Sequence, residues 1–259
     1  MNTKTLFTAF TLITCLLLGS CKDQESTDPE IGFSGCRLQQ WTFFNNELLT
    51  VSYDENNRIS GYTEDDLWNT QVSYDNQGRV SRVQDFARGE LSYEYIWSYT
   101  GGDKIPNKVQ QTIKKGEPDP DKPYRSFEND GSRITSMVIF RKEGGDPASR
   151  ELFTYVGSKL IEVRNEKYDS DVNRFYYSTK HDEFTYDAKG SPMVDNFWYL
   201  IYGDIELLPF GNNITSYRYN GSDWKFTYTY NVNDLPETQS ATYDGRAGDI
   251  RTFGYFCQD

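Results

Sequence analysis

The stretch YDENNRI at residues 53–59 decides the fold, because a closely similar stretch, YDNQGRV, follows at residues 74–80. In each, an aromatic residue ends a strand, and the next residue is an aspartate whose carboxylate can accept a hydrogen bond from the backbone two residues on. Asn57 or Gly78 then supplies a residue type that tolerates a left-handed backbone, as a short hairpin loop requires. An arginine and a branched apolar residue begin the return strand. The spacing predicts a tight antiparallel hairpin, since it is too short for a helical crossover.

Looser copies of this hairpin unit continue to the C-terminus, starting near residues 99, 127, 155, 186, 219, 230 and 243. Between them, segments such as 91–99 and 224–230 alternate large apolar-bodied residues with polar ones, which is the period of a strand with one buried face. The steps between copies vary, unlike the tighter period of propellers and solenoids. We therefore predict an all-β fold: a many-stranded antiparallel β-meander, curled into a half-barrel or open barrel with its aromatic face inside.

The composition narrows the classes of function. The chain has 259 residues, a net charge of -12 and 16% aromatic residues. Binding to nucleic acid or to an anionic membrane surface needs a basic patch, so this charge balance argues against both. The aromatic content is too high for a disordered chain. Length and composition suit a single β domain, which we place at residues 35–259.

Residues 1–20 have the pattern of a secretory signal peptide, in which Lys4 precedes an apolar run too short to span a bilayer permanently. The run ends in LGSC at residues 18–21, which resembles the lipobox of bacterial lipoproteins. In that family the signal is cut before the cysteine, which implies that Cys21 carries two or three fatty chains, palmitate among them, enough for stable anchoring. The alternative is an ordinary signal peptide followed by a chance cysteine.

Residues 21–34 are polar and acidic, and they predict a tether that follows the lipidated cysteine. The acidic residues after Cys21 resemble the signal that sends lipoproteins to the cell surface in one phylum of Gram-negative bacteria. The resemblance implies an outer-membrane protein displayed on the cell surface. The alternative orientation faces the periplasm.

Two cysteines remain in the predicted domain, Cys36 at its start and Cys257 at its end. Cys257 is in phase with Phe253 and Tyr255, which places it on the buried face of its strand. An exported protein meets oxidising conditions, and first and last strands are often neighbours. We therefore predict a disulfide between Cys36 and Cys257; the alternative is two buried free thiols.

The pattern Tyr-Asp-x-x-Gly/Asn-Arg-apolar at residues 53–59 and 74–80 resembles the YD repeat of RHS-type proteins, with looser forms at residues 184–190 and 228–236. Together with the lipobox and the chain length, it is similar to a group of lipoproteins of unknown function from Gram-negative bacteria. The resemblance covers most of residues 36–257 and implies a long β-meander that curls on itself. It does not imply the RHS toxin shell, which takes a far longer chain, and it brings no catalytic residues.

The inventory of reactive residues is short. His181 is the sole histidine, which removes histidine-based metal sites, and its charged surroundings predict a surface position. The sequence contains no cofactor fingerprint and no phosphate loop, so we expect no cofactor and no metal. The acidic residues leave room for a glycosidase carboxylate pair, but solvation and turn chemistry explain most of them.

Residues 197–210 depart from the repeat and contain Trp198, Tyr199 and Tyr202, which could form a platform for a sugar ring. The alternative is that they belong to the core or to a lid over an open end of the sheet. We predict a non-catalytic, lipid-anchored envelope protein that binds a glycan or an envelope protein, or acts as a scaffold. The competing hypothesis is a surface glycan hydrolase that uses an Asp/Glu pair.

Overall fold

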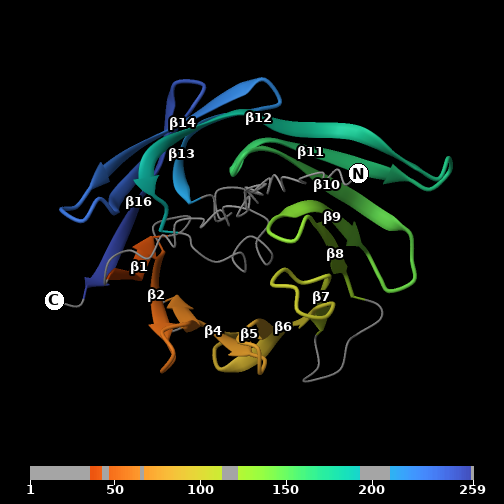
Figure 1. Cartoon of the computed structure of the whole chain (residues 1–259), viewed down its shortest axis with the longest axis horizontal. Helices are drawn as coiled ribbons and strands as arrows, with labels where there is room; N and C mark the ends of the chain where they lie inside the picture. The colour runs from red at the N-terminus through yellow and green to blue at the C-terminus, as the bar shows by residue number, and fades with distance from the viewer. Residues whose placement is uncertain (1–35, 43–46, 65–66, 113–121, 193–210, 258–259) are drawn as a thin grey trace, which may run out of the picture. The chain divides into compact units, whose positions relative to one another are not determined.

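The computed structural model describes residues 36–42, 47–64, 67–112, 122–192 and 211–257 (Figure 1). The chain divides into two units, residues 1–32 and residues 33–259, and every described residue belongs to the second. Within these ranges, no helix has the length and apolar character that crossing a bilayer requires. Their regular structure is antiparallel β-sheet, so the predicted all-β class is confirmed.

Sixteen strands make up the described part of this second unit, and each pairs antiparallel with the strands before and after it in sequence. In chain order they are β1 (Cys36–Thr42), β2 (Leu48–Tyr53), β3 (Ile59–Glu64), β4 (Trp68–Tyr74), β5 (Val80–Ala87), β6 (Glu90–Ser98), β7 (Lys108–Thr112), β8 (Tyr124–Asn129), β9 (Ile134–Phe140), β10 (Pro147–Val156), β11 (Lys159–Asp169), β12 (Arg174–Gly190), β13 (Asn212–Tyr219), β14 (Ser222–Tyr230), β15 (Pro236–Tyr243) and β16 (Arg246–Cys257).

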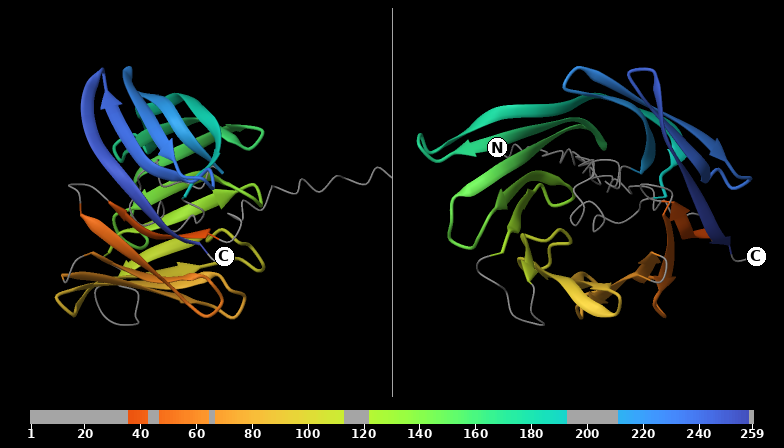
Figure 2. Two further views of the ribbon diagram at one scale, coloured as in Figure 1. Left: turned by 90° about the vertical axis from the view of Figure 1, so that its left-hand side faces the viewer. Right: turned by 180° about the vertical axis from the view of Figure 1, so that it is seen from behind.

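The sheet closes into a complete barrel, which corrects the predicted half-barrel or open barrel. Figures 1 and 2 show β16 returning beside β1, so that the last strand lies next to the first. The two strands pair antiparallel from Cys36 opposite Cys257 to Trp41 opposite Phe253. A disulfide joins Cys36 and Cys257 at one end of this seam. Closure gives backbone partners to both edge strands, which would otherwise be open to pairing with another chain.

The apolar side chains lie on the inner face of the barrel. Along β14, Trp224, Phe226 and Tyr228 are buried or half-buried, whereas Lys225 and Thr227 between them are exposed. Buried apolar residues from strands around the whole barrel form one cluster, and a closed sheet has one enclosed face on which such a cluster can gather. The aromatic face is therefore inside, as the alternation of the sequence predicts.

The Asp-Arg turns explain why the quoted stretch folds as a hairpin. One carboxylate oxygen of Asp54 accepts hydrogen bonds from the backbone N–H groups of Asn56 and Arg58, both at 2.9 Å. The other oxygen accepts from Nε of Arg58 at 2.8 Å. Asn57 adopts a φ of 60°, the left-handed conformation predicted for this position. Asp75 and Arg79 repeat the same contacts in the next hairpin.

Several hairpins are also joined to the next one by a tyrosine and a cation. The hydroxyl of Tyr74 donates to the backbone carbonyl of Ile59 at 2.8 Å, and the guanidinium carbon of Arg58 lies 4.1 Å from the centre of the Tyr74 ring. We call this arrangement the tyrosine ladder. Its hydroxyl-to-carbonyl steps are Tyr53 to Leu38, Tyr74 to Ile59, Tyr99 to Val80, Tyr155 to Ile134, Tyr186 to Leu160 and Tyr228 to Ile214.

Candidate functional site

A cluster of aromatic side chains gathers on the inner face of β12–β15, near the β13–β14 and β15–β16 turns. These turns lie at the end of the barrel opposite the Asp-Arg turns, because successive hairpins of a meander alternate between the two ends. We call this cluster the aromatic rim. It consists of His181, Tyr217, Tyr219, Trp224 and Tyr243.

Strand register brings the five rings together. His181 pairs with Tyr219 across β12 and β13, while Trp224 on β14 lies opposite Tyr217 on one side and Tyr243 on the other. Directly opposed residues of neighbouring antiparallel strands project to the same face, about 5 Å apart. The rim is therefore assembled from four strands, none of which carries it alone.

The rings pack in contact, and two of the pairs are nearly parallel. The centres of His181 and Tyr219 are 4.5 Å apart with 26° between their planes, and those of Tyr217 and Trp224 are 6.0 Å apart with 20°. Trp224 also meets Tyr243 at 5.0 Å. Tyr217 is buried, with 7% of its surface exposed, whereas Tyr243 is 38% exposed. The rings of the rim therefore differ in exposure, from the buried Tyr217 to the exposed Tyr243.

Two polar atoms of the rim are buried without a hydrogen-bond partner among the described residues, Nδ1 of His181 and Nε1 of Trp224. The hydroxyl of Tyr243, by contrast, donates to Oγ of Ser222 at 3.1 Å. Buried polar groups in native proteins nearly always have a partner, so unpaired ones call for an explanation. A bound ligand that supplies hydrogen-bonding groups is one such explanation.

The position of His181 corrects the predicted surface location. It is half-buried on the inner face, and burial lowers its pKa to about 4, with a smaller opposing effect from the charge of Asp182. The charged neighbours Lys180 and Asp182 suggested a surface position, but they project to the outer face while His181 projects to the inner one, because side chains alternate along a strand. Lys180 and Asp182 form an ion pair on the outer face of β12. His181 is therefore neutral at pH 7.

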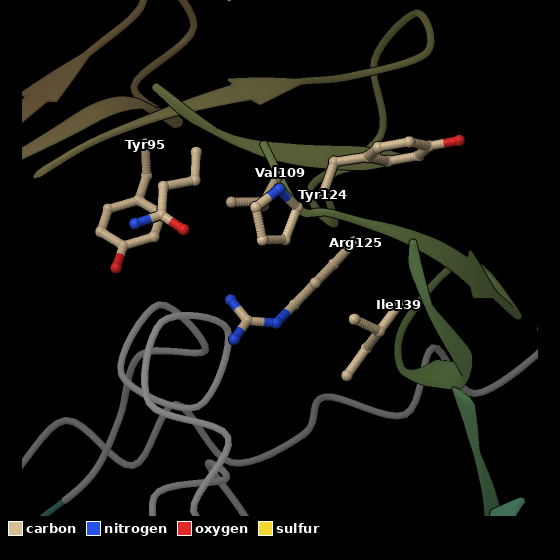
Figure 3. A pocket seen from close by; sticks show the side chains of 7 residues that line it. Tyr95, Val109, Tyr124, Arg125 and Ile139 are labelled. Carbon is tan, nitrogen blue, oxygen red and sulfur yellow. The ribbon is translucent and has the colours of Figure 1, made fainter. Parts of the chain in front are cut away.

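A second feature of the inner face is a small cavity of about 120 Å³ beneath β6–β9, whose lining includes Tyr95, Gln111, Arg125 and Ile139. Figure 3 shows Tyr95, Arg125 and Ile139 directed to one side of the sheet, and Tyr124 to the other. Burial raises the pKa of Tyr95 to about 12, and the charge of Asp85 adds to the effect. A cavity of this size admits a few water molecules or one small polar group.

Asp85 on β5 is one of two buried carboxyls on β5 and β6, the other being Glu94. It accepts a hydrogen bond from Oγ1 of Thr70, and burial raises its pKa above the ordinary value. Its cross-strand neighbours are Thr70 on β4 and Tyr93 on β6. A carboxyl that stays protonated to higher pH can act as a general acid, provided that a second carboxylate cooperates with it.

Other predicted site residues have different outcomes. Cys21, Trp198, Tyr199 and Tyr202 lie outside the described residues, so the expected lipidation site and sugar platform stay predictions. Among the residues that are described, no three His, Cys, Asp or Glu side chains gather as a metal site would require. The aromatic rim was not predicted from the sequence. The signal for it was present in the alternation of aromatic residues along 217–219 and 224–230.

Comparisons with known proteins place the chain near several solved structures. No protein-family model matches the sequence, and neither does any curated protein. The structure is similar to that of a porin-like protein from Bacteroides uniformis, with 12% identity, a TM-score of 0.49, and coverage of 86% of this chain and 95% of the other. A porin-like protein from Bacteroides vulgatus matches with 12% identity, a TM-score of 0.38, and coverage of 84% and 98%.

A third similar structure is a DUF3836 family protein from Bacteroides vulgatus, with 16% identity and a TM-score of 0.25. The match covers 47% of this chain and 99% of that one. Because these identities and TM-scores are low, we assign none of the properties of those proteins to this chain.

Proposed function

We propose that the protein is a non-catalytic, lipid-anchored protein of the bacterial envelope whose barrel acts as a binding module at the outer membrane. The observation that carries the proposal is the aromatic rim, in which the exposed Tyr243 and its neighbouring rings lie beside buried polar atoms without partners among the described residues. Aromatic side chains with a few polar groups are typical of ligand sites in proteins. We also propose kinship with YD-repeat lipoproteins, which the matching contacts of the Asp54 and Asp75 turns support.

Membrane attachment in this proposal depends on Cys21 and not on the barrel wall. On β14 the outward side chains include Lys225, Thr227 and Thr229, all of them exposed. On β4 the outward positions carry Asn69, Gln71 and Ser73. A barrel that spans a membrane carries an apolar band on its outside, whereas these strands are apolar inside. The pattern supports a barrel held beside the bilayer by a lipidated tether.

The anchor can be tested by labelling cells with a fatty acid analogue and separating their membranes. Wild type should be labelled and should sediment with the outer membrane, whereas Cys21→Ala should lose the label. Cys15→Ala is the matched control, since Cys15 lies in the expected signal peptide. If Cys21→Ala keeps its label, the anchor proposal is wrong. Digestion of whole cells with protease then separates surface display from a periplasmic orientation.

The binding module can be tested by immobilising the full-length protein and applying envelope extract. A ligand bound at the rim should be retained by wild type and lost by Trp224→Ala. Trp68→Ala is the control, because Trp68 lies on β4, away from the rim, and is 40% exposed. Retention that is equal for all three proteins would contradict binding at the rim.

The competing function is a glycan hydrolase, and the raised pKa of Asp85 is the observation that favours it. Such an enzyme needs a second carboxyl about 5–10 Å from the first. Release of reducing sugar from envelope polysaccharides by wild type, with loss of release in Asp85→Asn, would establish the hydrolase and overturn the non-catalytic proposal.

A further inference from the structure

We propose that the cavity beneath β6–β9 is a second binding site, separate from the aromatic rim, and that it takes a small aliphatic monocarboxylate such as propionate. The inference goes beyond the proposed function, because it concerns other strands and another ligand. Three features of the cavity support it: the polar side chains that meet there, the apolar side chains beside them and the size of the space.

Strand register brings three polar side chains to one part of the inner face. Tyr95 on β6 lies directly opposite Gln111 on β7, and Arg125 on β8 lies opposite Val109, two residues along β7 from Gln111. Opposed residues lie about 5 Å apart and diagonal ones about 7–8 Å, so long side chains at these positions can reach one small ligand. All three line the cavity, and Figure 3 shows the guanidinium of Arg125 extending toward the side on which Tyr95 lies.

Each of the three groups can donate a hydrogen bond. A guanidinium has five N–H donors, so Arg125 can keep its interactions within the chain and still donate to a ligand. The side chains of Tyr95 and Gln111 make no hydrogen bond to any other described residue, so their donors are available. Burial raises the pKa of Tyr95 to about 12, and its hydroxyl therefore keeps the proton that it would donate. A carboxylate only accepts, and its two oxygens match the fork of a guanidinium.

The rest of the lining selects what the carboxylate is attached to. Val109, Pro123 and Ile139 supply apolar surface beside the polar groups, which favours an aliphatic chain over an oxyanion that is polar on every side. The cavity has a volume of about 120 Å³. A water molecule occupies about 30 Å³ of the liquid, so this space suits a ligand of about four to six non-hydrogen atoms. Acetate, propionate and butyrate span this range.

The charge of the lining favours an anion. Arg125 is the charged residue among those that line the cavity. Asp85 on β5 and Glu151 on β10 also face inward, as their pairing with the buried Thr70 and Met137 indicates, but neither lines the cavity. Because Coulomb energy falls with distance, an anion in contact with the guanidinium gains more from Arg125 than it loses to acids beyond the lining.

The test is ligand-observed NMR titration of the full-length protein in detergent with acetate, propionate and butyrate. At least one of them should bind, and propionamide, which has the shape of propionate without its charge, should bind about tenfold more weakly than propionate. Arg125→Gln removes the cation and Gln111→Glu adds a like charge, so each should weaken carboxylate binding about tenfold. Arg164→Gln is the matched control, because Arg164 pairs with Glu166 on the outer face of β11. Trp224→Ala should also match wild type, since the rim is a separate site.

Three results would overturn the inference: no monocarboxylate binds, propionamide or inorganic phosphate binds more tightly than every monocarboxylate, or Arg125→Gln and Gln111→Glu both bind as wild type does. Thermal unfolding shows whether each variant is folded. Tyr95→Phe keeps the ring and removes only the hydroxyl, so it should weaken binding severalfold and keeps the test decisive if Arg125→Gln does not fold. Retention of envelope material through Trp224 is measured separately, so failure of this inference leaves the proposed function standing.

Discussion

The hydroxyl of Tyr74 donates a hydrogen bond to the backbone carbonyl of Ile59, 2.8 Å away in the preceding hairpin. Ile59 follows Arg58, whose guanidinium packs on the Tyr74 ring. The hydroxyl-to-carbonyl bond recurs at the other steps of the tyrosine ladder, and a cation also packs on the rings of Tyr53, Tyr99, Tyr155 and Tyr186. At these steps one hairpin fixes the position of the next. The repeated stretch therefore encodes two things: a turn through its aspartate and arginine, and the stacking of neighbouring turns through its tyrosine.

The ladder has a step at which the hydroxyl is missing. Between Tyr99 and Tyr155 the corresponding position is Asn129, which lies opposite Ile134 as Tyr74 lies opposite Val80. The backbone N–H of Phe127 donates to the carbonyl of Asn107 at 3.0 Å, which brings the two hairpins together.

Urea unfolding tests whether the steps of the tyrosine ladder contribute to stability. Tyr74→Phe removes an existing step and should lower the free energy of unfolding by about 1 kcal/mol. Phe153→Tyr adds a hydroxyl to a buried position off the ladder and should be destabilising. If Tyr74→Phe is as stable as wild type, the hydroxyl-to-carbonyl step does not stabilise the barrel.

The disulfide closes the seam between β1 and β16, which are joined by no hairpin. Its cysteines are 221 residues apart in sequence. Replacing both by serine should lower the free energy of unfolding by up to about 5 kcal/mol, because the unfolded chain regains the entropy of so long a loop. Denaturant unfolding of wild type with and without reductant gives the comparison. A double variant that is as stable as oxidised wild type would show that strand pairing alone holds the seam.

His181 should make the protein less stable in acid. Its pKa is about 4 in the folded state and 6.5 without the barrel, so the unfolded chain binds a proton more readily between these values. Stability is therefore lost as the pH falls from about 6.5 to 4, by up to about 3 kcal/mol. His181→Phe keeps a ring in the rim and should lose less stability over that range. Urea unfolding of both proteins at pH 7 and pH 4 provides the measurement. If both proteins lose the same free energy of unfolding between pH 7 and pH 4, the imidazole of wild type lies in solvent.

Asp85 should have the opposite pH dependence. Burial raises its pKa in the folded state above 3.8, so the folded state holds the proton more tightly than the unfolded chain does. Its contribution is most favourable below pH 3.8 and is lost as the pH rises through the folded pKa. Asp85→Asn keeps an oxygen that can accept from Thr70 but carries no charge. We predict that the variant is more stable than wild type at pH 7 and similar to it at pH 3. A variant that is less stable at pH 7 would show that the ionised carboxylate is favoured inside the barrel.

Local features of the fold follow from the sequence because their contacts are local. The turn at Asp54 depends on residues within five positions: its carboxylate accepts from the backbone two residues on and Asn57 is left-handed, both as predicted. The bond from Arg58 Nε to the same carboxylate was not predicted. The all-β class follows from the period-two alternation. The choice of inner face follows from the same pattern, since a strand can bury only one of its sides.

The aromatic rim could not be predicted in the same way, since no single strand contains it. His181 meets Tyr219 because β12 and β13 pair in a register that crosses a long connection, and Trp224 meets Tyr243 through a further pairing. His181 was assigned to the surface from its charged neighbours in sequence, yet those neighbours occupy the other face. A one-residue change of register would have placed His181 on the outer face.

The sequence by itself determined the hairpins, the strand alternation and the identity of the two cysteines at the ends of the domain, because each depends on residues close together in the chain or on simple periodicity. Only the tertiary structure decided that sixteen strands curl far enough for β16 to pair with β1, and that five rings from four strands form one surface. Closure depends on the twist and tilt accumulated over every strand of the sheet, and no short stretch of residues encodes that sum.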